Sequence, residues 1–301
     1  MPVNWQQKAD AEAAGAKDRD AEAAGAKDRD MGAANADMVR RVIAGKGPDK
    51  STPDPALGAR AVANIAAVHV PAFCGGRYKN AYDLGRIKPL GSGPPGQTVP
   101  LRALVDSVLS GLTGQPEETT YFLAMEVNGT GVRFYGDICL VLKATEDDTV
   151  MLDRNSYDLA RPPLTPAGTA PTPAAMASAV ADLWGRWKGD APDMAVLKTF
   201  ALRPDAVRRF TTGQISEAVL QDEDYLEVLR IGDFGHDDLQ EARVSAPDAA
   251  AEAQIGEQLR SGPCPSLAEL QWRKHRRQAV RALAGHGVAT RVVTTEGRTR
   301  S

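Results

Sequence analysis

The sequence is poor in cysteine and in aromatic residues, and it has no long apolar run. Cys74, Cys139 and Cys264 stand far apart, without a second cysteine or a histidine at metal-ligand spacing. This predicts reduced thiols and neither disulfides nor a zinc site. No stretch approaches the ~18 consecutive apolar residues of a membrane span, and the first residues lack the regions of a signal peptide. We therefore expect a cytoplasmic protein without a membrane partner; leaderless export as an effector is the alternative.

The sequence also has no large excess of positive or negative charge. The formal net charge is −3 and the isoelectric point is near 5.9, while 43% of the 301 residues are hydrophobic and 25% are charged. Proteins that bind nucleic acid without sequence preference need an excess of lysine and arginine to neutralise phosphates. The composition thus predicts an ordinary globular protein and argues against non-specific nucleic-acid binding.

Several signatures of common enzymes are missing. The chain contains no G-x-x-x-x-G-K-[ST] phosphate loop, no G-x-G-x-x-G after a strand and no G-x-S-x-G elbow. The four histidines, His69, His236, His275 and His286, form no H-x-x-x-H or H-E-x-x-H pair. The commonest nucleotide-binding, serine-hydrolase and zinc-hydrolase motifs are therefore excluded, and no metal is predicted.

The N-terminal segment consists of a short repeat followed by a linker. Ala11–Asp20 (AEAAGAKDRD) recurs unchanged as Ala21–Asp30, and Gly45–Pro55 is dense in turn-forming residues. A ten-residue period advances about 1000° on a helix, so no apolar stripe can persist from one repeat to the next. We predict a disordered or fraying helical tail and linker over residues 1–55, followed by one domain over residues 56–301.

The first part of the domain predicts two helices. Ala56–Val68 alternates small and branched residues at helical spacing. Leu101, Leu104, Val105, Val108, Leu109 and Leu112 recur at i, i+3, i+4, i+7, i+8 and i+11. That second pattern is typical of an amphipathic helix.

The strongest β character lies in the block Tyr121–Asp153, which we take as the centre of the fold. Strands are predicted over Thr119–Val127, Gly131–Lys143 and Thr149–Asp153, with Gly136 as a bulge in the second. Asn128-Gly129 tolerates the positive φ angles of a tight turn and predicts a hairpin. The block therefore predicts an antiparallel meander.

Helices and strands also mix in the C-terminal half. A helix should begin at Thr172 and Pro173, with Met176, Val180, Leu183, Trp184 and Trp187 on one face. Strands are predicted at Tyr225–Ile231, Asp238–Ser245 and Val288–Thr294, and Ser266 to Glu269 is a capping box that opens a helix ending near His286. The expected fold class is α+β: a mostly antiparallel central sheet with flanking amphipathic helices.

Three segments carry a family resemblance. Phe134–Lys143 (FYGDICLVLK), followed by Asp153–Tyr157 (DRNSY), resembles a segment of ADP-ribosyltransferase-like toxin and effector domains. Tyr225–Val244 (YLEVLRIGDFGHDDLQEARV) is similar to the catalytic strand of that group, and Ala282–Val293 to its helix-glycine-strand ending. The resemblance spans residues 121–157, 225–245 and 282–293. Val228-Leu229 departs from the Ala-Gln of the family pattern, and no first-strand arginine motif is present.

The resemblance implies a transferase that cleaves NAD and passes ADP-ribose to a macromolecular acceptor, with a protein acceptor or an antitoxin as partner. Glu227 would bind the nicotinamide ribose and stabilise the developing positive charge, and Ser156 would brace Glu227. Arg77 is the best-placed cation for the pyrophosphate. Tyr135 or Tyr157 would stack on the nicotinamide. NAD enters as a substrate.

Other interpretations of the same residues remain open. Arg77 could simply bind a carboxylate, Ser156 could form a turn after Asn155, and Glu227 could face water on an alternating strand. Cys74, beside two glycines and Arg77, could serve as the nucleophile of a thiol-dependent hydrolase. A non-enzymatic interaction or scaffold protein, whose charged N-terminal segment binds a partner, is the remaining alternative.

Overall fold

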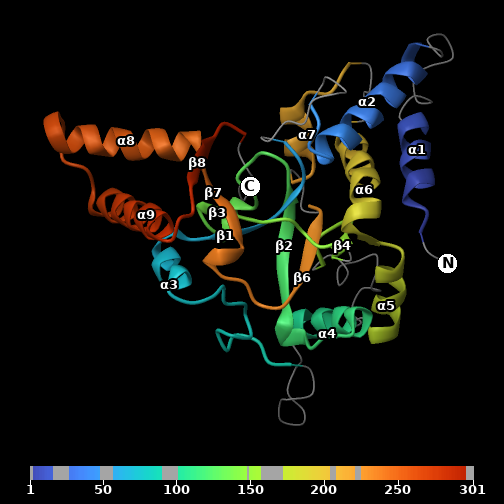
Figure 1. Ribbon diagram of the computed structural model, residues 1–301, viewed down its shortest axis with the longest axis horizontal. Coiled ribbons are helices and arrows are strands. Elements are labelled where there is room, and N and C mark those ends of the chain that lie inside the picture. Colours follow the sequence, from blue (N-terminus) through green and yellow to red (C-terminus); the bar gives the residue numbers. More distant parts are fainter. Residues whose placement is uncertain are drawn as a thin grey trace.

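The computed structural model describes residues 3–15, 27–47, 57–89, 101–147, 149–156, 172–203, 208–220 and 225–295. Within these ranges one sheet has the strand order β5-β4-β6-β2-β1-β3-β7-β8, and helices surround it (Figure 1). All neighbouring strands are antiparallel except β7 and β8, which are parallel. The fold is α+β, as predicted.

The strands are β1 (Arg60–Ile65), β2 (Thr120–Glu126), β3 (Ile138–Leu142), β4 (Val150–Leu152), β5 (Trp184–Arg186), β6 (Glu227–Ile231), β7 (Leu239–Ser245) and β8 (Thr290–Val293). The α-helices are α1 (Trp5–Gly15), α2 (Lys27–Ile43), α3 (Val70–Cys74), α4 (Leu101–Thr113), α5 (Pro173–Ala181), α6 (Trp187–Leu202), α7 (Thr212–Ala218), α8 (Ala246–Ser261) and α9 (Leu267–Gly285). Figure 1 places α8 and α9 at one end of the molecule and α1, α2 and α6 at the other.

The centre of the sheet is β1, where the sequence predicted a helix over Ala56–Val68. The four middle residues of β1 are buried between β2 and β3. A strand buried on both faces lacks the alternation of apolar and polar residues, so its pattern does not separate it from a buried helix. Because β1 lies between β2 and β3, the predicted Asn128-Gly129 hairpin and the meander are wrong.

The segment before β3 is also not the long strand that was predicted from Gly131. Arg133–Tyr135 forms a 3-10 helix, and Gly136 then passes very close to the end of β1. A Cβ atom on Gly136 would lie 2.0 Å from the carbonyl carbon of Ile65 and 2.3 Å from the nitrogen of Ala66. Glycine is therefore required here by close backbone approach, and Gly136 is not a bulge.

Replacing Gly136 by alanine should destabilise the protein. Both clashing atoms belong to the backbone, so the end of β1 or the 3-10 helix has to shift, and overpacking of this kind costs about 1–3 kcal/mol. Denaturant unfolding measures the loss. Gly111→Ala on α4 is the matched control, because its Cβ would meet nothing within 4 Å and alanine favours a helix. Equal stabilities of the two variants would contradict the expectation.

Most other predicted elements are confirmed. Helix α4 and strands β2, β4, β6, β7 and β8 occupy the expected positions. Ser266 Oγ accepts from the backbone nitrogen of Glu269, whose carboxylate accepts from the nitrogen of Ser266, which is the predicted capping box. The helix predicted from Thr172 is shorter than expected: α5 ends at Ala181, Trp184 lies on β5, and Trp187 begins α6.

The described parts of the N-terminal segment are packed helices, where the sequence predicted a fraying or disordered tail. Helices α1 and α2 both contact α6, and Trp5, Ala9 and Val39 are buried in the main core. The indole nitrogen of Trp5 donates to the carbonyl oxygen of Trp184 at 3.2 Å. Alanine side chains allow close helix approach, so a narrow surface is enough for packing. Residues 16–26 of the repeat lie outside the described residues.

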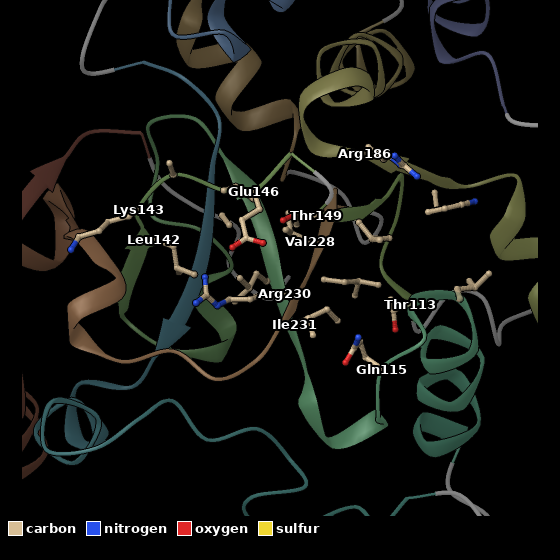
Figure 2. Close-up of a pocket in the computed structure, with 18 residues that line it drawn as sticks. Thr113, Gln115, Leu142, Lys143, Glu146, Thr149, Arg186, Val228, Arg230 and Ile231 are labelled. Carbon is tan, nitrogen blue, oxygen red and sulfur yellow. The ribbon is translucent and has the colours of Figure 1, made fainter.

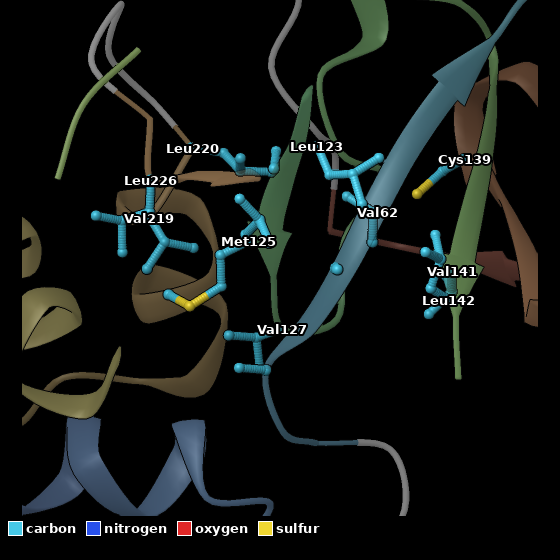
Figure 3. Packing of buried hydrophobic residues seen from close by; sticks show 14 of the residues in the cluster. Val62, Leu123, Met125, Val127, Cys139, Val141, Leu142, Val219, Leu220 and Leu226 are labelled. Carbon is cyan, nitrogen blue, oxygen red and sulfur yellow. The ribbon is translucent and has the colours of Figure 1, made fainter. Parts of the chain in front are cut away.

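Two hydrophobic clusters hold the sheet and helices together. The larger one joins the central strands to the helices at both ends, and Figure 3 shows Val62, Met125 and Val141 within it. The smaller cluster packs α4 and α5 against β4 and β6 through Leu109, Leu152 and Leu229, among others. No described helix combines the length and the hydropathy needed to cross a membrane.

Candidate active site beside strand β6

Strand β6 carries Glu227 into the interior of the protein. In the sheet, Glu227 lies opposite Ala124 of β2 on one side and Leu152 of β4 on the other. Side chains alternate along a strand, so Glu227 and Leu229 point to one face, and Val228 and Arg230 to the other. Glu227 is only 1% exposed. The alternative interpretation, in which Glu227 faces water, is therefore wrong.

Ser156 contacts Glu227 directly. The backbone nitrogen of Ser156 donates to Oε2 of Glu227 at 2.9 Å, and both residues are buried. Arg102, on the first turn of α4, donates from Nη1 to Oγ of Ser156 at 3.1 Å. Its guanidinium also lies 3.5 Å from the ring centre of Phe122. The structure thus brings together two of the predicted site residues and adds an arginine that was not predicted.

A second layer holds Arg102 in place. Its Nε lies 2.7 Å from Oδ1 of Asp106, one turn further along α4. Asp106 is buried, and Oδ2 of its carboxylate accepts a hydrogen bond from the hydroxyl of Tyr82 at 2.7 Å. The contacts therefore run without a break from Tyr82 through Asp106, Arg102 and Ser156 to Glu227. We call these five residues the Glu227 cluster.

Burial dominates the electrostatics of the Glu227 cluster. It raises the pKa of Glu227, while the charge of Arg102 and the hydrogen bonds from Ser156 act in the opposite direction. Burial likewise raises the pKa of Asp106, against the attraction of Arg102. The pKa of Tyr82 is raised, first by burial and then by the charge of Asp106. A carboxyl with a raised pKa is suited to exchange protons or to stabilise a nearby positive charge.

Tyr135 approaches the Glu227 cluster from the surface. Its side chain belongs to the 3-10 helix before β3, is 53% exposed and packs on the ring of Phe134. Tyr225, two residues before Glu227 on the same face, is buried. The pKa of Tyr225 is raised well above its usual value, mainly by burial. The charge of Glu227 and the neighbouring hydroxyl of Tyr135 act in the same direction. Tyr135 therefore lies between solvent and the buried Tyr225, on the side of the site that faces solvent.

Arg77 lies in a different environment. Its Nη2 lies 2.6 Å from Asp83, and Nη1 lies 2.8 Å from Asp233 and 3.2 Å from the hydroxyl of Tyr121. Both terminal nitrogens of this guanidinium are already paired with a carboxylate, so its fork is occupied and is poorly placed to hold a pyrophosphate. The adjacent groove of about 570 Å³ also exposes Glu118. The structure does not bring Arg77 to Ser156 and Glu227, and Arg102 occupies that position.

Two further sequence predictions concern Tyr157 and Cys74. Tyr157 lies outside the described residues. Cys74 is 2% exposed at the end of α3, and burial raises the pKa of its thiol. A buried, protonated thiol is a poor nucleophile. The environment of Cys74 thus argues against the thiol-dependent hydrolase.

The structure also brings together two histidines that are isolated in the sequence. Nδ1 of His286, after α9, lies 3.1 Å from Nε2 of His236, at the start of the turn before β7. Across the described part of the chain, no group of three or more histidine, cysteine, aspartate or glutamate side chains is arranged to hold a metal ion.

Sequence reasoning missed Arg102, Asp106, Tyr82 and Tyr225. A usable signal exists for the first two: Arg102 and Asp106 are opposite charges at i and i+4 on a helix that is otherwise apolar or small on that side. Tyr82 and Tyr225 carry no local pattern, since only the tertiary structure brings them close. Comparisons of the chain with family models, with curated proteins and with solved structures find no match.

Proposed function

We propose that the protein is an ADP-ribosyltransferase-like enzyme that cleaves NAD at the Glu227 cluster and transfers ADP-ribose to a macromolecular acceptor. The observation that carries the proposal is the contact of Ser156 with Glu227, with Arg102 on the serine hydroxyl. The family resemblance implies a serine that braces a glutamate on a strand. A buried serine, glutamate and arginine in direct contact support that arrangement, with Arg102 in the place first given to Arg77.

The chemistry assigns a role to each group. The bond between nicotinamide and C1′ of the ribose breaks, and its electron pair leaves with nicotinamide. The carboxylate of Glu227 stabilises the positive charge that develops on the ribose. A nucleophilic oxygen or nitrogen of the acceptor then bonds to C1′ and loses its proton. Arg102 would bind a phosphate of NAD with its guanidinium fork, and the exposed ring of Tyr135 would stack on nicotinamide.

Because Glu227 is enclosed by the protein, the proposed reaction requires a conformational change. At 1% exposure its carboxylate does not reach solvent, so the proposal requires a covering group to move when NAD binds. Tyr135 is the half-exposed residue next to the site, and its displacement would open the way past Tyr225. Closure around the ligand would then exclude water, which strengthens the charge interactions inside the site.

Replacing each of the two candidate arginines by glutamine, one at a time, tests the proposal. With nicotinamide-labelled NAD, the wild-type protein should release nicotinamide, and Arg102→Gln should reduce the rate about 100-fold. The variant loses the phosphate contact and the hydrogen bond to Ser156, and loss of one preorganised polar contact in an active site costs roughly 10²–10³ in rate. Arg77→Gln is the matched control and should retain the rate within about threefold. No release by the wild type, or loss in Arg77→Gln with retention in Arg102→Gln, would overturn the proposal.

The non-enzymatic alternative gives the Glu227 cluster a purely structural role. A scaffold protein would need the cluster only to satisfy buried polar groups. Removing the N-terminal segment does not separate the two functions cleanly, because Trp5, Ala9 and Val39 belong to the core. The two functions differ in what a neutral replacement of Glu227 should do.

A further inference from the structure

A cavity of about 460 Å³ lies beside the C-terminal half of β6, beyond Glu227. It exists because the strands of the sheet differ in length. The register pairs β4 with β6 only as far as Val150 opposite Leu229, while β6 continues through Arg230 and Ile231 beside β2. The end of α4, the connection from β3 to β4 and strand β5 enclose the resulting notch, and Figure 2 shows Arg230, Glu146 and Gln115 around it.

The floor of this cavity is apolar. Leu123 of β2 and Val228 of β6 line it from the sheet, together with Leu142 at the end of β3. Ile231 completes the floor and is 41% exposed, which is high for a large apolar side chain at the end of a central strand. An apolar floor below a polar rim suits a small molecule that carries both kinds of surface, and the volume is within the usual ~300–1,000 Å³ of ligand sites.

The rim is mainly cationic. Lys143, Arg186 and Arg230 line it, against the single carboxylate of Glu146. Arg230 is held by Asp238, with Nη2 lying 3.2 Å from Oδ1, and Lys143 is held by the carbonyl oxygen of Asp237. Even when Asp238 is counted with the rim, positive charge exceeds negative charge, although the whole chain has a net charge of −3. Such a local excess favours an anion.

Two buried polar atoms at the rim lack hydrogen bonds. Nε of Arg230 and Oγ1 of Thr145 are both buried and have no partner within the described part of the chain. Buried donors are nearly always satisfied, so an unsatisfied one calls for a water molecule, an ion or a ligand. Both belong to residues that line the same cavity. A ligand with acceptor oxygens would satisfy them.

We propose that this cavity binds a small organic anion, with a carboxylate toward Arg230 and Lys143 and a short apolar chain on the floor formed by Leu123, Val228 and Ile231. The site is distinct from the Glu227 cluster, because none of the five residues of that cluster lines the cavity. It does not depend on the proposed NAD chemistry. A carboxylate with an apolar chain matches both the charge of the rim and the surface of the floor.

Calorimetric titration of the full chain with octanoate tests the site, with octylammonium and inorganic phosphate as comparison ligands. Octanoate should bind with one-to-one stoichiometry, and octylammonium and phosphate should each bind at least about tenfold more weakly, because one has the wrong charge and the other lacks the apolar chain. Arg230→Gln should weaken octanoate about tenfold. Glu146→Gln should strengthen it a few-fold, because a like charge is removed.

Two further variants keep the test decisive. Arg260→Gln, on the exposed side of α8, is the control and should leave octanoate binding unchanged. Lys143→Gln replaces Arg230→Gln if the latter lowers the melting temperature, and it should weaken octanoate in the same direction. Equal binding of octanoate and octylammonium, or an unchanged affinity in both Arg230→Gln and Lys143→Gln, would overturn the proposal.

Discussion

A Glu227→Gln variant is expected to lose nicotinamide release by about 100-fold or more while its stability is unchanged or increased. Glutamine keeps an oxygen that can accept the hydrogen bond from the nitrogen of Ser156, so the packing persists. What it lacks is the negative charge that stabilises the developing cation, and loss of one such group costs roughly 10²–10³ in rate. Nicotinamide release and denaturant unfolding, measured on the same preparation, test both parts.

The expected gain in stability follows from the raised pKa of Glu227. A carboxyl whose pKa is higher in the folded protein than in the unfolded chain binds its proton more tightly when folded. The free energy of unfolding therefore falls as pH rises from the unfolded pKa, near 4.5, through the folded pKa. Glutamine does not titrate, so Glu227→Gln should lack this fall, and its advantage over the wild type should grow across that range.

Glu126→Gln is the matched control for this variant. Glu126 is as buried as Glu227, lies on the neighbouring strand β2, and accepts hydrogen bonds from the hydroxyl of Ser216 and the backbone nitrogen of Val127. Its neutral replacement should leave nicotinamide release within about threefold of wild type. If Glu227→Gln and Glu126→Gln have the same activity, the Glu227 cluster has a structural role, and the non-enzymatic alternative is favoured.

Arg276→Met should cause the largest loss of stability. Arg276, on α9, is 1% exposed and lies 3.0 Å from Asp137, 3.4 Å from Asp248 and 3.4 Å from Glu252. Methionine fills a similar volume but leaves these partly buried carboxylates without their shared cation, although Asp248 keeps its pair with Arg133. Breaking a buried ion pair from one side costs about 3–5 kcal/mol. Urea unfolding measures the loss.

The neighbouring residue provides the control for this prediction. Arg277 lies on the exposed side of the same helix, and Arg277→Met should change the free energy of unfolding by no more than about 0.5 kcal/mol. The difference between the two variants isolates the buried network from the helix propensity of arginine and methionine. A loss of less than about 1 kcal/mol in Arg276→Met would contradict the role assigned to this residue.

Local sequence patterns predicted much of the fold. They failed where long-range packing determines the secondary structure or the order of the strands. The apolar spacing of α4 and the capping box of α9 are properties of adjacent residues, and both are confirmed. Strand β1 was mistaken for a helix because burial on both faces removes the alternation that identifies a strand. That single error also produced the false meander, since β1 separates β2 from β3.

The candidate site was predicted only in part, for a related reason. Glu227 and Ser156 were selected from the resemblance, and the structure brings them into contact. Arg77 was selected as the best-placed arginine in the absence of a first-strand arginine motif, but Asp83 and Asp233 neutralise it. Which arginine approaches Ser156 depends on where α4 packs against β4 and β6, and no local pattern specifies that contact.

The packing of α1 against α6 has a consequence for synthesis of the chain. Trp5 leaves the ribosome before its hydrogen-bond partner Trp184, which follows 179 residues later. At about 5–20 residues per second, α1 waits roughly 10–35 s for the surface that buries it. Apart from Trp5, this helix offers only alanine as apolar surface, which limits aggregation during the delay. The low hydrophobicity of the N-terminal segment thus suits a helix that must stay soluble until the rest of the chain is made.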